Sequence, residues 1–522
     1  MKRNMKQSIA SVLSMVIMLF SFAACSGETF TSDVPTISET PVSIEQNEQN
    51  EQTEQTEQTE QNEIIDLSQQ EPYTAYIVFY GDSKSADTEA VSKALSEITK
   101  AKLNTTVEIT CIGYGSIEEQ LNLMLASGEP LDIFPIGNAK HAANGQIIPL
   151  DDLLQTAGKE TYDQISSSDW AGVTFDGNIY CVPTNGEKAS GKGLVMNKDI
   201  CDELEIDYEN IKDYDGIYEM LVKVRDAYPN VYPLVSNYGG MNIQHPVDSL
   251  GDNFGVLLDP YNSDALIVED LYSSDYYREL CETMYQWAQE GLIMSDADTN
   301  TEAGKSLLGA GRGFARFTSL KPGFEAEQSA AIGIDLVTSS YAEPLSTTIS
   351  SGWSIAVNSK DPIRAMQVIN LLYTDPEASN IAINGVQGVH WDFVDEGKGI
   401  IDYPEGVDSS NVGYIRVAWG WPNQQISYIW NGASENLWSD LKVFNETAAI
   451  SPAKGFSFDN SNVVNEIAAC KNVTNKYCAA LECGTLDPAE ALPQFLKELE
   501  ANGINRIIDE KQRQLDEWAA NR

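Results

Sequence analysis

The sequence predicts an α/β fold in which a mainly parallel sheet is covered by helices. Strand and helix patterns alternate in a βαβαβ order between residues 73 and 134, and that order is typical of parallel sheets. The 522-residue chain is also long enough to form two or three packed domains after its first 72 residues.

Each element of this order has its own signal. Residues 73–80 form a strand pattern, and residues 87–103 carry apolar side chains at helical spacing. Residues 105–112 then alternate between apolar and polar side chains. Ser116, with a glutamate three residues later, predicts a capping box before the next helix. Residues 131–134 form the next buried strand pattern.

Polar turns that contain glycine follow all three strands, at residues 80–83, 114–116 and 136–138. In parallel sheets, ligands bind beyond the carboxyl ends of the strands. Tyr80, Asp82 and Asn138 are therefore candidate ligand-binding residues.

The first 25 residues form the pattern of a lipoprotein signal peptide. Three basic residues precede an apolar core at residues 9–22, and residues 22–25 resemble a lipobox that ends at Cys25. The core is shorter than the roughly 20 residues that span a bilayer. We expect lipidation of Cys25 to anchor the chain to the outer face of the cell membrane and to be its only contact with the membrane.

Residues 26–72 are predicted to be a disordered acidic tether. Glutamate recurs at every third position between residues 45 and 63, without aromatic or aliphatic side chains. Such a segment buries too little apolar surface to offset the entropy of ordering.

The composition excludes several classes of partner. A net charge of −45 argues against nucleic acid and against an anionic membrane surface, because both require a basic face. The cysteines show no CxxC pair, and the three histidines are scattered. We expect no metal, no cofactor and no catalytic residue. We do not expect an enzyme, although an exported glycoside-active enzyme stays open as an alternative.

Several segments resemble extracellular solute-binding proteins of ABC importers, of the maltose-binding type known as family 1. These segments are residues 145–154, 175–183, 193–199, 285–293 and 350–359. In that family, the turn that corresponds to Asp176-Gly177 joins two strands, and the second strand leads through a hinge into the other lobe.

The end of the chain is similar to a lipoprotein subfamily with a characteristic C-terminal domain of unassigned function. The similar segments are residues 371–376, 385–391, 403–408, 457–459 and 512–518. The chain departs from that subfamily at residues 421–424, where it has Trp-Pro-Asn-Gln.

The resemblance implies a two-lobed periplasmic-binding-protein-like fold, in which each lobe is a mainly parallel sheet flanked by helices. We expect residues 73–182 and 335–372 to form the first lobe. Residues 190–330 and 375–522 would form the second lobe, including a C-terminal helical region, with crossings near Thr184 and Val337. The chain would act as a monomer and deliver its solute to the permease subunits of an ABC importer.

The aromatic residues favour an oligosaccharide as the solute. Sugar rings pack their C–H faces on aromatic side chains and exchange hydrogen bonds with amides and carboxylates. The candidate platforms are Trp353, Trp419, Trp421 and Trp430, and core packing is the alternative for each of them. Polar candidates are Tyr80, Asp82 and Asn138 in the first lobe, with Asn185, Glu187, Tyr238, Arg316 and Gln424 elsewhere.

Two other functions remain open at this point. An exported glycoside-active enzyme would use similar aromatic residues, and a tethered sugar sensor would bind without transport. The solute also remains open between a neutral oligosaccharide, a uronic-acid-containing oligosaccharide and a peptide.

Overall fold

The computed structural model describes residues 71–262 and 266–521, whose strands form two main sheets and two small ones. The predicted signal peptide with Cys25, and the predicted tether up to residue 70, lie outside the described residues. Among the described residues, no helix combines the length and the hydropathy needed to cross a membrane.

The first sheet has the strand order β10-β3-β1-β2. Strand β1 pairs in parallel with both β2 and β3, whereas β10 is antiparallel to β3. The predicted βαβαβ order is confirmed by β1 (Tyr73–Tyr80), α1 (Ser85–Leu103), β2 (Thr105–Ile112), α2 (Ile117–Ser127) and β3 (Ile133–Asn138). Strand β10 (Ser351–Ile355) enters the sheet from the second lobe.

The predicted capping box at Ser116 is wrong. Helix α2 begins after Ser116, but the hydroxyl of this residue caps none of the helix amides. It donates instead to the carbonyl of Gly113, at 3.2 Å. The backbone of Ser116 is not extended, with φ −125° and ψ −6°, and so the hydroxyl is not directed at the first turn.

A two-stranded hairpin and short helices follow the first sheet. Strands β4 (Thr174–Phe175) and β5 (Asn178–Ile179) flank Asp176 and Gly177, which both have positive φ. An Asp-Gly pair tolerates this conformation in a tight hairpin turn. The short helices are α3 (Ala139–Ala143), α4 (Asp151–Leu154), α5 (Lys159–Tyr162) and α6 (Ser167–Gly172).

The second sheet has the order β14-β9-β6-β8-β7. Its central strand β6 is antiparallel to both β8 and β9, so this sheet is not mainly parallel as we predicted. The cause is topological, because β6 enters this lobe from the first lobe and β9 runs back toward it. The strands are β6 (Ser190–Asn197), β7 (Tyr232–Leu234), β8 (Gly313–Leu320), β9 (Leu336–Ser346) and β14 (Ala449–Ile450).

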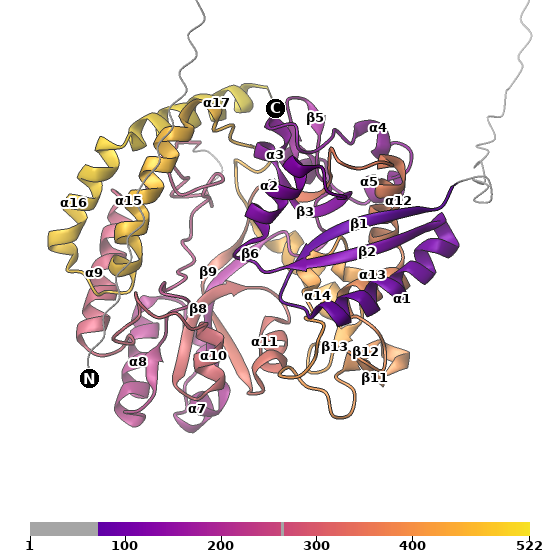
Figure 1. The fold of residues 1–522 in the computed structure, drawn as a ribbon. Coiled ribbons are helices and arrows are strands. Elements are labelled where there is room, and N and C mark those ends of the chain that lie inside the picture. Colours follow the sequence, from indigo (N-terminus) through magenta and orange to yellow (C-terminus); the bar gives the residue numbers. More distant parts are fainter. Residues whose placement is uncertain (1–70, 263–265, 522) are drawn as a thin grey trace, which may run out of the picture. The chain divides into compact units, whose positions relative to one another are not determined.

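Helices surround this second sheet, and Figure 1 shows their arrangement. They are α7 (Lys198–Glu203), α8 (Tyr214–Ala227), α9 (Asp275–Gln289), α10 (Gly304–Gly309) and α11 (Phe324–Ile332). The 3-10 turn η2 (Tyr208–Asn210) lies between α7 and α8.

The predicted return to the first lobe at residue 335 is too early. Val337 pairs with Met196 of β6, and the whole of β9 belongs to the second sheet. The chain reaches the first sheet only at β10, after residue 350. A single strand pattern does not show which sheet it joins, so the crossing near Val337 is corrected to residues 347–350.

The predicted placement of everything after residue 375 in the second lobe is also wrong. Helix α12 (Pro362–Thr374) and helix α13 (Pro376–Asn384) both pack on α1. Ala382, Ile383, Val417 and Trp421 join the hydrophobic core of the first sheet. Residues 376–386 and 414–421 therefore extend the first lobe, because their apolar face completes its core.

Residues that follow α13 in the chain form a third, small sheet. Trp391, Ile401 and Trp430 form its small core. It consists of β11 (Asp392–Asp395), β12 (Ile400–Asp402) and β13 (Ile429–Trp430), with α14 (Leu437–Thr447) after it. Three 3-10 turns connect this region: η3 (Glu396–Lys398), η4 (Ala418–Gly420) and η5 (Gln424–Ile426).

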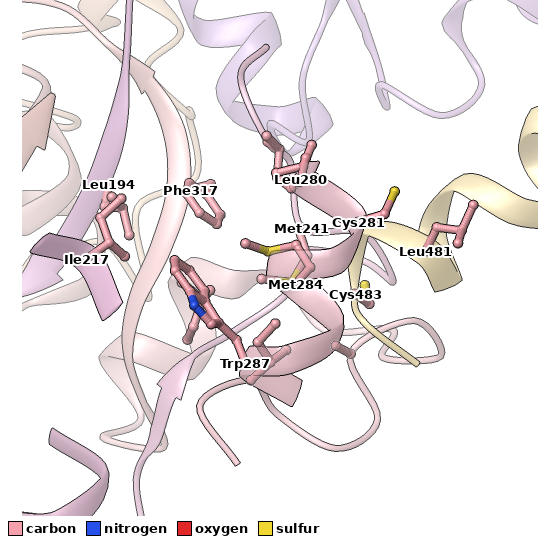
Figure 2. Packing of buried hydrophobic residues seen from close by; sticks show 14 of the residues in the cluster. Leu194, Ile217, Met241, Leu280, Cys281, Met284, Trp287, Phe317, Leu481 and Cys483 are labelled. Carbon is pink, nitrogen blue, oxygen red and sulfur yellow. The ribbon is translucent and has the colours of Figure 1, made fainter. Parts of the chain in front are cut away.

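The C-terminal helices pack on the second lobe. Helices α15 (Val464–Glu482) and α16 (Pro488–Ala501) contact α9, beside which they lie in Figure 1. Figure 2 shows Leu481 and Cys483 of this region near Cys281 and Met284 of α9. The 3-10 turn η6 (Ser461–Val463) precedes α15, and α17 (Ile504–Ala520) follows α16. Helix α17 contributes the fully buried Lys511, whose ammonium lies 2.7 Å from Asp252.

An ion cluster lies where the chain crosses between the lobes. The carboxylate of Asp169 is buried on α6 and lies 2.6 Å from Lys188 and 3.4 Å from Lys454. Burial raises the pKa of Asp169, but Lys188 and Lys454 more than offset this and hold the pKa below its usual value. Lys188 precedes β6 and Lys454 follows β14, so one first-lobe carboxylate holds two crossing segments.

Candidate functional site

A cavity of about 340 Å³ lies between the two lobes. Helices α10 and α11 of the second lobe form one wall, through Lys305, Glu327, Gln328, Ala330 and Ala331. The opposite wall consists of Asp82 and Tyr114, which follow strands β1 and β2, and of residues between 384 and 430. We call this cavity the cleft.

The aromatic wall of the cleft is the surface of a stack of rings that begins in the first-lobe core. Trp353 stacks on Trp421 at 5.3 Å between ring centroids, and Trp421 stacks on Phe79 at 4.3 Å. Phe79 and Tyr80 are neighbours in β1, with centroids 4.6 Å apart. The core rings therefore fix the position of Tyr80, the last residue of β1.

Tyr80 then supports the two rings that face the cleft. Its centroid lies 5.1 Å from that of Trp419 and 5.3 Å from that of Tyr114. Trp419 is 42% exposed and Tyr114 is 52% exposed, whereas Tyr80 is buried. A Cβ at Gly420 would lie 2.4 Å from the Tyr80 hydroxyl oxygen, so a glycine is required for this packing.

Two of the four predicted platforms do not face the cleft. Trp353 and Trp421 are fully buried, and the Trp353 indole donates to the carbonyl of Gly420 at 2.9 Å. The prediction that they contact ligand is corrected, because both rings are covered by the rest of the stack. Trp419 and Trp430 line the cleft, although Trp430 is only 8% exposed.

Of the polar candidates, Asp82 lines the cleft directly. Three others form a network where the chain crosses between the lobes. The Asn185 amide donates to Asn423 at 3.1 Å, and Gln424 donates to the Glu187 carboxylate. Glu187 also lies 2.9 Å from Lys321, and these side chains therefore hold the crossing rather than line the cleft.

The remaining polar candidates lie away from the cleft. Asn138 caps α3 by accepting hydrogen bonds from Lys140 and His141. Tyr238 is 68% exposed in a turn of the second lobe and does not line the cavity. Arg316 is buried in β8, where it donates to Gln328 at 3.1 Å. Burial lowers the pKa of Arg316 to about 10, and its role here is to support Gln328, which lines the cleft.

The most distinctive polar group of the cleft is Arg416, which the sequence did not indicate. Its Nε donates to Asn384 at 2.9 Å, and its guanidinium carbon lies 5.8 Å from the Trp430 ring centroid. Burial lowers the pKa of Arg416. Among the described residues it forms no ion pair within 4 Å, so its remaining N–H groups are available to a ligand.

Glu327 of α11 faces Arg416 across the cleft and balances its charge. Lys321 lies 3.5 Å from Glu327 and 2.9 Å from Glu187. Burial lowers the pKa of Lys321, but these two carboxylates more than offset this and raise the pKa above its usual value. Arg416 and Glu327 thus provide the cleft with a donor and an acceptor.

Two further groups shape the cleft wall. The Nδ1 atom of His390 accepts from the Val386 amide at 2.9 Å, so its Nε2 carries the proton and donates to Asp87 at 3.0 Å. Burial raises the pKa of Tyr114 to about 12, so this ring stays neutral. Tyr114 stood in the polar turn after β2, and its place at a strand end could have identified it.

In the described part of the chain, no three His, Cys, Asp or Glu side chains are arranged to hold a metal ion. The cleft has an aromatic wall and a polar wall. This combination lies between two lobes that are joined by crossing segments.

The comparison with protein families decides which proteins share this arrangement. The model of bacterial extracellular solute-binding proteins matches residues 81–378, which is more than half of the chain. The chain belongs to this family. A separate model, of a domain of unknown function, matches residues 452–520, which contain helices α15, α16 and α17. The predicted family and the predicted additional domain are both confirmed.

Curated and solved relatives agree with this assignment. A carbohydrate ABC transporter substrate-binding protein of Streptococcus pneumoniae is 26% identical over 457 residues, covering 85% of this chain and 90% of the relative. The crystal structure of an N-glycan transport solute binding protein from the same species has a TM-score of 0.77 at 23% identity. The match covers 86% of this chain and 100% of the solved relative.

A more distant structure has the same fold. The S. pneumoniae ABC-transporter substrate binding protein FusA, in complex with kestose, has a TM-score of 0.58 at 15% identity, covering 86% of this chain and all of that chain. The predicted two-lobed α/β fold is therefore confirmed. Family membership also places this solute-binding protein outside the cytoplasm.

Proposed function

We propose that this solute-binding protein captures an oligosaccharide in the cleft and delivers it to an ABC importer. The observation that carries the proposal is the wall formed by Tyr114 and Trp419 opposite the polar residues of α11. Their ring planes differ by 19°, their centroids are 6.4 Å apart, and both residues line the cleft. A sugar ring packs its C–H face on such a surface.

The polar groups of the cleft suit a hydroxylated and neutral ligand. Arg416 offers N–H donors, whereas Glu327 and Asp82 offer carboxylate acceptors. A hydroxyl group both donates and accepts, so it satisfies both kinds of partner. The lining has two cations, Arg416 and Lys305, and two carboxylates, so its charges balance and do not favour a charged ligand.

The relatives support the same class of ligand. The N-glycan transport protein of S. pneumoniae has been solved with Man1GlcNAc, at a TM-score of 0.74, and with Man5GlcNAc, at a TM-score of 0.72. Man1GlcNAc and Man5GlcNAc are therefore the first probes to use with this protein.

Delivery to an importer requires that the two lobes close around the ligand. The lobes are joined by a few crossing segments, which Asp169 holds together through Lys188 and Lys454. Ligand that contacts both walls shifts the population toward the closed form, and a permease then recognises the closed surface. We also propose that the protein acts as a monomer, tethered by residues 26–72 to a lipidated Cys25.

A thermal-shift screen followed by calorimetry tests the choice of ligand. The panel contains Man1GlcNAc, Man5GlcNAc, xylan and fructan oligosaccharides, oligogalacturonates and oligopeptides. A ligand at a hundredfold excess over its dissociation constant stabilises the folded state by about 2.7 kcal/mol. We expect stabilisation by a neutral oligosaccharide. Binding of peptides or uronates alone would contradict the proposal.

Two further measurements separate transport from the other functions. If the protein were an enzyme, incubation with a bound glycan would release shorter products, which chromatography detects. If it were a sensor without transport, deletion of the gene would leave uptake of the glycan unchanged. We expect an intact glycan and a loss of uptake.

A further inference from the structure

The segment that follows β14 lies beside the segments that cross between the lobes. We call this segment, residues 451–456, the hinge strap. It begins where the Ser451 amide donates to the Ser346 carbonyl of β9 at 3.0 Å. The Lys454 ammonium donates to the Ser346 hydroxyl at 2.9 Å, and that hydroxyl donates to the Lys188 carbonyl at 2.7 Å. The hinge strap, the end of β9 and the segment before β6 are therefore connected at one side chain.

Further contacts fix the hinge strap to the crossing segment that follows β9 and to the first lobe. The Thr348 hydroxyl donates to the Ala453 carbonyl at 3.2 Å and accepts from the Gly455 amide at 2.9 Å. A Cβ at Gly455 would lie 3.5 Å from the Cβ of Ala171, in the first-lobe helix α6. Lys454 forms its ion pair with the same helix. The hinge strap thus contacts the first lobe through both its backbone and its cation.

The other side of the hinge strap is held by the second lobe and by α17. The Ser451 hydroxyl donates to the Asp248 carboxylate, which belongs to the second lobe. Phe456 belongs to a hydrophobic cluster with Leu515 of α17. Its ring also lies edge to face with that of Trp518, at 6.0 Å between centroids. The last helix of the chain therefore supports the segment that contacts the first lobe.

The domain of unknown function is itself fixed to the second lobe. Phe495 and Ile507 are buried in the same hydrophobic core as residues of α9 and β6. Gln512 of α17 donates to the Leu266 carbonyl at 2.9 Å and accepts from the Val268 amide at 2.7 Å. The second lobe and this domain therefore form one body, and the hinge strap joins that body to the first lobe.

We propose that the domain of unknown function braces the hinge and limits the arrangements that the two lobes adopt in the unbound protein. Lys454 and Gly455 lie outside the cleft lining, so the brace acts without contacting the ligand. Apparent affinity is the intrinsic affinity reduced by the fraction of molecules whose walls are placed to bind. The brace raises this fraction, and with it the affinity for any ligand of the cleft. The inference rests on the proposed function only for the ligand with which affinity is measured.

Calorimetry of variants in the hinge strap tests the brace. Lys454→Met removes the tie to α6 and should weaken Man1GlcNAc and Man5GlcNAc by the same factor, on the order of three- to tenfold, because it lowers the competent fraction alone. Thr348→Val removes the hydroxyl tie, keeps both ion pairs of Asp169, and should weaken both glycans by a smaller common factor. Lys476→Met, whose ammonium pairs with Glu498 inside the C-terminal domain, is the matched control and should bind as the unmodified protein does.

Hydrogen exchange of the unliganded protein tests the same point without a glycan. In Lys454→Met the amides of residues 345–350 should exchange on the order of tenfold faster, whereas those of α15, α16 and α17 should be unchanged. Thermal unfolding verifies that each variant folds. A loss of affinity confined to one glycan, or an unchanged affinity and exchange in Lys454→Met, would overturn the brace, as would faster exchange throughout α15 to α17. If neither glycan binds to any form of the protein, the choice of ligand falls, and faster exchange confined to the crossing segment still supports the brace.

Discussion

Trp419 and Trp421 are separated by one residue, yet Trp421 is an inner ring and Trp419 an outer ring of the same stack. Trp421 is fully buried against Phe79 and Trp353, whereas Trp419 rests on Tyr80 and presents its outer face to the cleft. Phe79, Trp353 and Trp421 are each within 6 Å of the other two, so these inner rings cover one another. Trp419 is 42% exposed, and its exposed surface is available for a sugar.

Two cations show the same contrast between interior and cleft. Lys511 is fully buried, and its ammonium contacts Asp252 at 2.7 Å and the Gly255 carbonyl at 2.9 Å. Arg416 is held by Asn384 and forms no ion pair among the described residues. Interior groups that are fully paired stabilise the fold, whereas partly paired groups in the cleft remain available to a ligand.

The largest expected effect is the loss of stability when an inner ring is removed. Trp421→Ala should lower the free energy of unfolding by about 3 to 5 kcal/mol, because it leaves a cavity beside Phe79. Trp419→Ala should lower it by less than about 1 kcal/mol, since this ring is already partly exposed. Urea unfolding of both variants measures the difference, and equal losses would refute the distinction between the two ends.

Glu482 tests whether an interior charge without a cation behaves differently from Lys511. This carboxylate lies 3.1 Å from the Tyr277 hydroxyl and 3.9 Å from His245. Burial raises the pKa of Glu482 to about 7 and lowers the pKa of His245 to about 4, so the histidine carries no charge at neutral pH. The folded state therefore favours the protonated acid.

The sign of the resulting pH dependence follows from this raised pKa. The contribution of Glu482 to stability is complete below its unfolded pKa of about 4.3, and it is lost as pH rises through about 7. Glu482→Gln should remove this loss. At pH 8 the free energy of unfolding of this variant should be about 3 kcal/mol higher than that of the unmodified protein, and at pH 4 the two should be about equal. Unfolding curves at both values measure it.

Glu490→Gln, at an exposed position of α16, is the matched control for the change at Glu482. The pH dependence that Glu482→Gln shows is compared with that of this variant, and the difference between the two is assigned to burial. A Glu482→Gln variant that is less stable at pH 8 than the unmodified protein would show that the ionised carboxylate is favoured in the interior.

At the outer end of the stack, the expected effect moves from stability to affinity. Trp419→Ala should weaken binding of the glycan identified in the screen by about 1 to 3 kcal/mol, which is on the order of ten- to a hundredfold. Trp419→Phe keeps a flat ring and should recover part of that loss. Calorimetry measures both variants, and an unchanged affinity in Trp419→Ala would remove this ring from the site.

The sequence predicted the parts of the molecule that depend on local periodicity. Strands β1 and β2 begin and end as the patterns indicated, because the spacing of apolar residues within each segment is enough to mark a buried strand. The crossing at residues 347–350 was misplaced because β9 has the pattern of a strand in either sheet. Only its partner β6, more than a hundred residues earlier, decides which sheet it joins.

The site was predicted less well, for a related reason. A tryptophan after a glycine at a strand end has the same sequence pattern whether it faces a cleft or a core. Trp353 is buried because Trp421 and the Gly420 carbonyl, 67 positions away, cover it. Arg416 and Glu327 gave no signal, since charged residues in loops and on helices are usually solvated.

The smallest expected effect concerns the geometry of the guanidinium rather than its charge. Arg416→Lys keeps a cation above Trp430 but loses the planar arrangement of N–H donors, of which Nε is fixed by Asn384. Affinity for the glycan should fall by about 1 kcal/mol, because one or two hydrogen bonds to hydroxyls are lost while the charge balance with Glu327 is kept. Stability should change little, since the ammonium is still able to reach Asn384.

Arg416→Met removes the charge as well and should weaken binding further. Lys442→Met, at an exposed position of α14, controls for the loss of a surface cation. If Arg416→Lys binds the glycan as tightly as the unmodified protein, the planar donors of Arg416 make no contact with the ligand. The contrast between the interior and the cleft would then rest on the two rings, Trp421 and Trp419, and no longer on the two cations.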